Sequence, residues 1–197
     1  MTQEHLANIN LDEPEETQSM NTRKFMLWLA IVSLTMFWAA WTSGYLVRKA
    51  EGRWHEFELP QMLWYSTGIL LISSISMFLA LRAAKKDDFT TLKIAISITF
   101  VFGITFLVLQ VLGFKQLIDE KLFLAGSDVA SSWLYMFMIG HILHIISGLV
   151  VLGVSFFSSF KFTSESKNLL RIELCSTFWH YLDFLWLYLF LFLYFNR

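Results

Sequence analysis

The sequence predicts an all-α integral membrane protein, built as a bundle of five transmembrane helices. Apolar residues make up 56% of the 197 residues and charged residues only 16%, against about 25% charged in a soluble globular protein. A soluble fold of this size could not cover so much apolar surface with polar side chains. The formal net charge of −1 gives no attraction for a polyanion, which argues against a nucleic-acid partner.

Five long stretches of low charge provide the helices. About 20 residues cross a hydrocarbon layer 30 Å thick, whereas the strands of a membrane barrel would read as alternating segments of about 10 residues. The predicted helices run over about 25–47, 59–82, 92–117, 129–160 and 170–196. Residues 25–197 are therefore expected to form one five-helix membrane domain, preceded by an acidic, polar tail over residues 1–24.

The positions of Lys and Arg predict the orientation of the bundle. With the N-terminus in the cytoplasm, nine of these residues lie on the cytoplasmic side of the membrane and six on the outer side. Cytoplasmic loops carry an excess of positive charge. We therefore expect the tail and the N-terminus to be cytoplasmic and the C-terminus to be periplasmic.

Polar side chains inside the predicted spans are the candidate functional residues. An ionisable group within a bilayer is costly unless it is paired, so it marks a functional site by default. The candidates in the last three helices are Gln110, His141, His144, Glu173, His180 and Asp183. Asp183 and the two histidines of 129–160 are expected at the same depth, where a carboxylate–imidazole contact would offset the burial of both groups.

Three interpretations of these side chains remain open. They could form a buried hydrogen-bonded network that fixes the register of the helices. They could instead bind a haem or a metal ion, since neutral imidazole is a common ligand. The chain would then be a small membrane cytochrome or a transporter with its own ligand site between the fourth and fifth helices. Glu173, His180 and Asp183 could also form a proton relay, because they share one face of the last helix.

The same helices carry motifs that resemble those of a known family. The fourth helix has a Gly-His-x-x-His stretch, and the fifth has a glutamate followed by Trp-His-x-x-Asp-x-x-Trp-Leu. The matching residues are Gly140, His141, His144 and Gly148, then Glu173, Trp179, His180, Asp183 and Trp186, and in the third helix Gly103, Phe106 and Gln110. The chain resembles subunit III of the haem-copper terminal oxidases, the cytochrome c oxidase subunit III family, in its five-helix bacterial form.

The resemblance implies a non-catalytic accessory subunit of an aa3-type cytochrome c oxidase. That proton-pumping complex reduces O₂ to water during aerobic respiration in the bacterial inner membrane. Haem and copper are expected in the partner subunits and not in this chain. The chain itself would support catalytic subunit I, contact other oxidase subunits, bind structural phospholipid and join a larger respiratory supercomplex. Subunit III of a quinol oxidase is the alternative, although its five-helix form tends to lack a carboxylate at the position of Glu173.

Two departures from the family pattern carry consequences. The two N-terminal helices of the seven-helix form are missing, so the first helix here corresponds to the third of that form. Many members also carry a membrane-embedded carboxylate on this helix, and Ser33 stands at its position. A role in proton handling that depends on that carboxylate is therefore not expected.

Two surfaces are predicted to contact partners. A basic cytoplasmic rim should lie near phospholipid headgroups, because juxtamembrane Lys and Arg attract anionic lipid. Its residues are Lys161, Lys167 and Arg171. The first helix is the predicted docking face for the larger subunit, through its small and hydroxyl-bearing side chains Ser33, Thr35, Thr42, Ser43 and Gly44.

Overall fold

The computed structural model describes residues 22–52, 59–119, 129–161 and 166–196, with the side chains of 158–161 and 166–168 left out. It contains five helices, and each is long and apolar enough to cross a membrane. They are α1 (Thr22–Ala50), α2 (Gln61–Lys85), α3 (Phe89–Asp119), α4 (Val129–Lys161) and α5 (Ser166–Asn196). The predicted fold class is confirmed. Residues 1–21 of the predicted tail lie outside the described residues.

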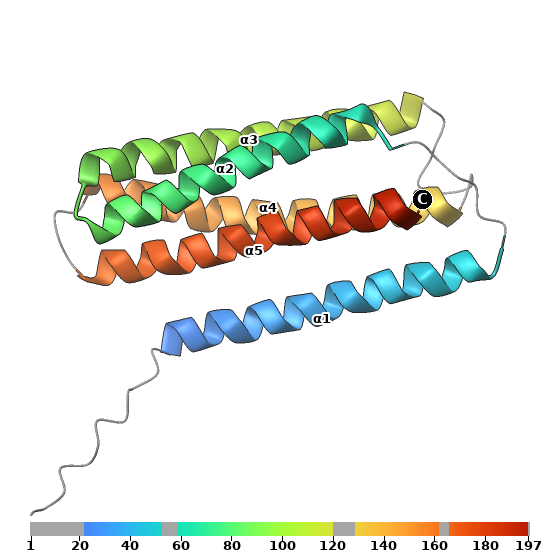
Figure 1. Cartoon of the computed structure of the whole chain (residues 1–197), viewed down its shortest axis with the longest axis horizontal. Helices are drawn as coiled ribbons and strands as arrows, with labels where there is room; N and C mark the ends of the chain where they lie inside the picture. Colours follow the sequence, from blue (N-terminus) through green and yellow to red (C-terminus); the bar gives the residue numbers. More distant parts are fainter. Residues whose placement is uncertain (1–21, 53–58, 120–128, 162–165, 197) are drawn as a thin grey trace, which may run out of the picture.

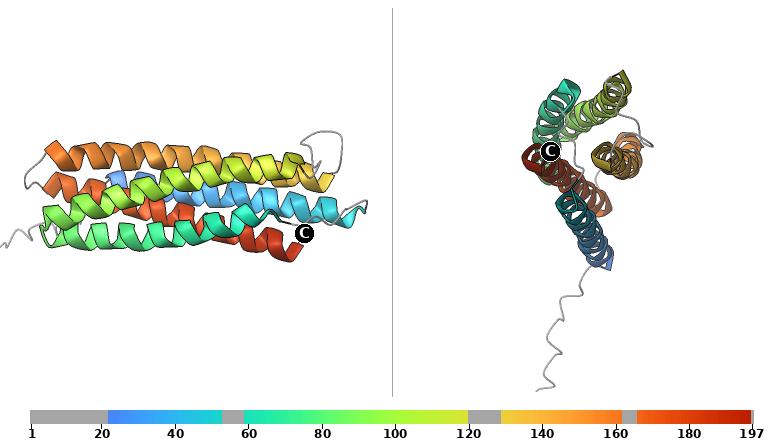
Figure 2. Two further views of the ribbon diagram at one scale, coloured as in Figure 1. Left: turned by 90° about the horizontal axis from the view of Figure 1, so that it is seen from above. Right: turned by 90° about the vertical axis from the view of Figure 1, so that its right-hand side faces the viewer.

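Helices α2 to α5 form a four-helix bundle, and α1 lies outside it (Figure 1). Within the bundle α2 packs on α3 and α5, and α4 also packs on α3 and α5, so each helix has two neighbours. The end-on view in Figure 2 shows α1 at the edge of the bundle, next to α5, and side chains of α1 also pack against α4. The buried residues of α1 are few: Ile31, Trp38, Thr42 and Tyr45.

Glycines at the centre of the bundle allow the helices to approach closely. A Cβ atom added at Gly103 would lie 2.8 Å from the ring of Trp179 and 2.8 Å from the side chain of Leu149. A Cβ atom added at Gly148 would lie 2.5 Å from Leu182. Small residues let helix backbones come together in lipid, where no hydrophobic force drives association. Gly103 of α3 and Gly148 of α4 therefore fix where α5 lies.

Some of the residues predicted to form the docking face of α1 contact the bundle instead. Thr42 is buried and its hydroxyl lies 3.0 Å from the Tyr188 hydroxyl of α5. Thr35 donates a hydrogen bond of 3.3 Å to the Tyr181 hydroxyl, and Gly44 faces the ring of Trp133 on α4. The prediction that these residues form the docking face is therefore wrong for Thr42, which is buried, and stays a prediction for Ser33, Thr35 and Ser43, which are exposed, and for the half-buried Gly44.

A tight turn joins α2 to α3 and is closed by Asp88. The Asp88 carboxylate accepts a 3.1 Å hydrogen bond from the Thr91 backbone N–H and a 2.5 Å hydrogen bond from the Thr91 hydroxyl. Aspartate is a preferred residue just before a helix because it satisfies a free N–H of the first turn. The hydrogen bonds from the Thr91 hydroxyl and amide hold the pKa of Asp88 below its usual value, since they favour the ionised carboxylate.

Replacing Asp88 with alanine is expected to loosen the first turn of α3. Because the pKa of the folded state is lowered, the contribution of this cap is present above the usual aspartate pKa of about 3.9 and is lost as the pH falls through the lowered pKa. Hydrogen-exchange protection of the amides in 89–92 should fall in Asp88→Ala at neutral pH. Asp88→Asn, which keeps the acceptor without the charge, should retain protection without this pH dependence. A protected first turn in Asp88→Ala would contradict the assignment.

Candidate functional site

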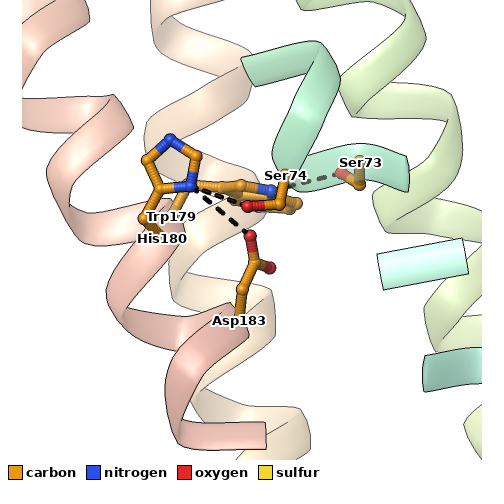
Figure 3. Close-up of polar contacts among 5 residues, drawn as sticks. All are labelled: Ser73, Ser74, Trp179, His180 and Asp183. Carbon is orange, nitrogen blue, oxygen red and sulfur yellow. Dashed lines mark hydrogen bonds and ion pairs between the residues drawn. The ribbon is translucent and has the colours of Figure 1, made fainter. Parts of the chain in front are cut away.

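The polar side chains of α5 reach different partners along the helix. Near its beginning, the Glu173 carboxylate pairs with the Lys24 ammonium group of α1 at 2.7 Å. Two turns further on, His180 and Asp183 lie beside Ser74 of α2 (Figure 3). The residues predicted to share one face of the last helix therefore do not form one cluster. Glu173 joins α5 to α1, and His180 joins α5 to α2.

His180, Asp183 and Ser74 form the centre of the site. The Nδ1 atom of His180 lies 2.8 Å from the Ser74 hydroxyl and 3.8 Å from a carboxylate oxygen of Asp183. Asp183 is only 7% exposed, and neither of its carboxylate oxygens makes a hydrogen bond to a described residue. A buried carboxylate without a partner is costly.

A row of hydroxyl groups on α2 satisfies the indole and amide groups of the neighbouring helices. The Trp179 indole N–H donates to the Ser73 hydroxyl at 3.2 Å, as Figure 3 shows. The Trp186 indole N–H donates to the Thr67 hydroxyl at 3.0 Å. Gln110 of α3 donates to a third member of the row, the Ser66 hydroxyl, at 3.2 Å. These contacts fix the register of α2 against α5 and α3.

His141 occupies an aromatic pocket instead of a polar one. Its ring centroid lies 4.9 Å from that of Trp186 and 5.9 Å from that of Phe106, and the residue is fully buried. Neither ring nitrogen has a hydrogen-bond partner among the described residues. His144 differs, since its Nδ1 atom lies 2.6 Å from the Gly140 carbonyl oxygen.

Among the described residues, Asp183 makes no hydrogen bond to a histidine of α4, contrary to expectation. Asp183 does lie at the same depth as the histidines of α4. Leu182 packs against Gly148 and Trp186 packs against His141, so Asp183 lies between these two levels of α4. The histidine that Asp183 approaches is His180 on its own helix, three residues earlier.

No group of three His, Cys, Asp or Glu side chains that could hold a metal ion is found in the part of the chain that the structure describes. His141 is enclosed by aromatic rings, and His180 approaches a hydroxyl and one carboxylate. The arrangement is suited to holding the helices in register.

Sequence reasoning missed the residues that complete these contacts. They are Ser66, Thr67, Ser73 and Ser74 of α2 and Lys24 of α1. A signal was present in the spacing: hydroxyl residues recur seven positions apart on α2, as Trp179 and Trp186 do on α5. Residues seven apart share a helix face.

The predicted basic rim is only partly visible. Arg171 lies exposed in the first turns of α5. Lys161 ends α4 and Lys167 lies near the start of α5, but their side chains lie outside the described residues. The contact of these three residues with lipid headgroups therefore stays a prediction.

His141 offers a test of the network. A buried polar group without a hydrogen bond costs about 1–3 kcal/mol, so His141→Leu is expected to stabilise the chain by about 1 kcal/mol. His144→Leu loses a hydrogen bond and should destabilise it by a similar amount. The exposure of Cys175 reports unfolding, because this single cysteine is 1% exposed and reacts with thiol reagents only when it opens. A loss of stability in His141→Leu would show that His141 has a partner.

Comparison with known proteins identifies the family. A family model described as "Cytochrome c oxidase subunit III" matches residues 20–197, which include all five helices. The chain belongs to the cytochrome c oxidase subunit III family. As a member with five membrane-spanning helices, it is a multi-pass protein of the bacterial inner membrane. The comparisons do not favour the alternative of a membrane cytochrome or transporter with its own ligand.

Relatives in the family carry two kinds of name. The chain is 29% identical over 195 residues to cytochrome bo(3) ubiquinol oxidase subunit 3 of Pseudomonas aeruginosa, which covers 94% of this chain and 92% of the relative. It is 27% identical over 183 residues to cytochrome c oxidase subunit 3 of Bacillus sp. strain PS3, covering 90% and 88%. A ubiquinol oxidase subunit 3 of Buchnera aphidicola is 31% identical over 140 residues, covering 71% and 67%.

Proposed function

We propose that this subunit III is the accessory, non-catalytic subunit of an aa3-type cytochrome c oxidase. In this role it packs against the catalytic subunit I, which carries haem and copper and reduces O₂ to water. The observation that supports the proposal is the use of the buried polar groups. Ser74, His180 and Asp183 contact one another, and Trp179 and Trp186 donate to hydroxyl groups of α2, so the site serves the bundle itself.

Glu173 supports cytochrome c as the electron donor of the complex. The five-helix quinol-oxidase subunits that this chain resembles tend to lack a carboxylate at this position. Here the carboxylate has a structural role, since it holds α1 to α5 through Lys24. Both side chains are partly exposed, at 51% for Lys24 and 25% for Glu173. An ion pair of this kind contributes about 1 kcal/mol or less.

A quinol oxidase is the second candidate function. The Pseudomonas aeruginosa relative named as a ubiquinol oxidase subunit covers more of this chain than the Bacillus relative named as a cytochrome c oxidase subunit. Both candidates place the chain in a haem-copper oxidase, and they differ in the electron donor and in the haem of subunit I.

Purification through an affinity tag on this chain, in a mild detergent, tests the proposal. We expect subunits I and II to co-purify, with haem a absorption and oxidation of reduced cytochrome c. Oxidation of a quinol without oxidation of cytochrome c, accompanied by haem b or o, would overturn the proposal in favour of the second candidate. A chain that purifies alone and keeps its own Soret band would overturn both.

The orientation is part of the proposal: the N-terminus lies in the cytoplasm and the C-terminus in the periplasm. Asp87 lies in the turn between α2 and α3, and Gly52 follows α1 at the opposite end of the bundle. An impermeant thiol reagent should label Asp87→Cys only in inside-out vesicles and Gly52→Cys only in right-side-out vesicles. Wild-type protein is the control, because Cys175 is buried. The reverse pattern would contradict the orientation.

A further inference from the structure

We propose that the acidic segment 12–16 of this chain docks in a cleft between the start of α1, the end of α2 and the start of α5. Its carboxylates pair there with Lys85 of α2 and compete with Glu173 for Lys24 of α1. The occupant is therefore part of the same chain, within residues 1–21, which lie outside the described residues. The contact is made within one chain, so it does not depend on the electron donor, the orientation or the partner proposed above.

The end of the bundle where α1, α3 and α5 begin is basic (left in Figure 1). The described side chains of 22–24, 82–93 and 171–173 lie at this end. They include seven Lys and Arg and three Asp and Glu residues, a net charge of +4. A surface with an excess of one sign of charge attracts a segment of the opposite sign.

A cleft of about 260 Å³ gives this end a defined binding surface. Its charged lining residues are Lys24, Lys85 and Glu173, and Lys24 and Glu173 form an ion pair at 2.7 Å. Lys85 forms no ion pair with any residue that the structure describes. The Asp88 carboxylate, three positions further on, is engaged by Thr91. The cleft thus holds two cations and one anion, and a further carboxylate would bring it to neutrality.

The size and walls of the cleft suit an acidic side chain. Sites for small molecules are typically about 300–1,000 Å³, and this cleft is slightly smaller. Leu27 and Trp28 line it from α1, and Leu81 lines it from α2. These apolar walls exclude part of the water around Lys85, and a lower local dielectric strengthens the attraction between opposite charges.

The segment before α1 has the complementary charge. Residues 1–21 contain five Asp and Glu residues and no Lys or Arg. Four of the five lie within 12–16, and the fifth is Glu4. A membrane surface with anionic lipid repels such a segment, whereas the basic end of the bundle attracts it. The charge pattern therefore favours the basic end over the adjoining lipid surface.

The acidic segment is also tethered close to the cleft. Glu16 lies six positions before Thr22, where α1 begins. Six residues span at most about 20 Å, and Lys24, in the first turn of α1, lines the cleft itself. A tether this short keeps the carboxylates at a local concentration in the millimolar range. Ion pairs that are weak one by one on an exposed surface can therefore hold the segment together.

Carbodiimide crosslinking of the tagged complex tests the contact directly, because this reagent joins a carboxylate to a neighbouring amine without a spacer. Trypsin releases the segment as peptide 1–23, since Arg23 is the first Lys or Arg of the chain. Mass spectrometry should find this peptide joined to Lys85 about 3–5-fold more often than to Lys86, in line with one ion pair. Lys86 is the next residue along the chain and does not line the cleft. Equal yields at the two lysines would overturn the proposal, because a general attraction to a basic surface treats both alike.

An exchange of charges tests the pairing in both directions. Lys85→Glu should abolish the crosslink at position 85. Glu15→Lys/Glu16→Lys in the same chain should restore it, with the amine and the carboxylate exchanged. Lys86→Glu with the same two substitutions in 12–16 is the matched control and should not form this crosslink. Failure of the exchange at position 85 to restore the crosslink would overturn the proposal.

A glutamate-specific protease measures the fraction of time for which the segment is docked. When docking is faster than cleavage, the rate of cleavage within 13–16 follows the population of the undocked segment. Lys85→Gln should raise this rate about 3–5-fold, and Lys86→Gln should leave it unchanged. In 1 M salt, where the screening length is about 3 Å, Lys85→Gln and wild type should be cleaved at the same rate. Equal rates at low salt would contradict docking at Lys85.

Two other occupants of the cleft give distinct results. If lipid headgroups occupied it, nanodiscs of equimolar phosphatidylglycerol and phosphatidylcholine would abolish the crosslink that forms in phosphatidylcholine alone, whereas the docked segment predicts a crosslink in both. If the segment bound another oxidase subunit, peptide 1–23 would be joined to that subunit instead of to Lys85. Either result would overturn the proposal. A complex that oxidises a quinol instead of cytochrome c changes none of these measurements, so the proposed function is tested separately.

Discussion

Trp179→Ala is expected to lower the free energy of unfolding by about 3–5 kcal/mol, the range for truncating a large aromatic side chain in a core. Trp179 is 1% exposed, and its ring packs against Gly103 of α3 and Gly148 of α4. Its removal leaves a cavity between three helices and takes away the indole donor of Ser73. The reactivity of Cys175 toward a thiol reagent, followed against temperature in the purified complex, measures the loss.

Trp64→Ala is the matched control for this substitution. Trp64 is 52% exposed and packs edge-on against Phe190 and Tyr194 near the end of α5. Removal of an exposed ring leaves no enclosed cavity, so the effect should be well below that of Trp179→Ala. Equal losses in the two variants would show that Trp179 does not hold the bundle together.

Gly103→Ala is expected to destabilise the bundle by about 2–3 kcal/mol, toward the upper end of the range for overpacking a core. The added Cβ atom would lie 2.8 Å from both Leu149 and Trp179, so side chains on two neighbouring helices must move at once. Gly68→Ala on α2 is the control. Its Cβ atom meets nothing within 4 Å, and the higher helix propensity of alanine should add up to about 1 kcal/mol of stability. If Gly103→Ala left the free energy of unfolding unchanged, α3 and α5 would be able to move apart without loss of stability, which would contradict this prediction.

The number and approximate bounds of the helices could be predicted because they depend on local composition. Uncharged stretches such as 59–82 and 129–160 are long enough to cross the bilayer, and the structure places α2 at Gln61–Lys85 and α4 at Val129–Lys161. Their rotation about the helix axis was harder to predict. The stretch 184–192 is apolar all round, so hydropathy gives no preferred face. Close contacts at Gly103 and Gly148 set that rotation instead, and these depend on residues far away in the sequence.

The candidate site shows the same limit. Asp183 and His141 were correctly expected at neighbouring depths, but depth alone does not say which side chains meet. Asp183 approaches His180, and His141 packs against Trp186. No role was predicted for the serines of α2, although Ser74 completes the contact with His180. The partner of a polar group in a membrane is decided by helix rotation, which the sequence pattern leaves open when all faces are apolar.

The position of α1 outside the four-helix bundle has a consequence for biosynthesis. Thr35 and Thr42 bond to Tyr181 and Tyr188, which are both 146 residues later in the chain. At about 5–20 residues per second, the ribosome needs about 7–30 s to make that length. α1 can therefore pack against α4 before α5 is made, through contacts such as that of Trp38 with Phe137, but its hydrogen bonds to the tyrosines of α5 form only after α5 is made.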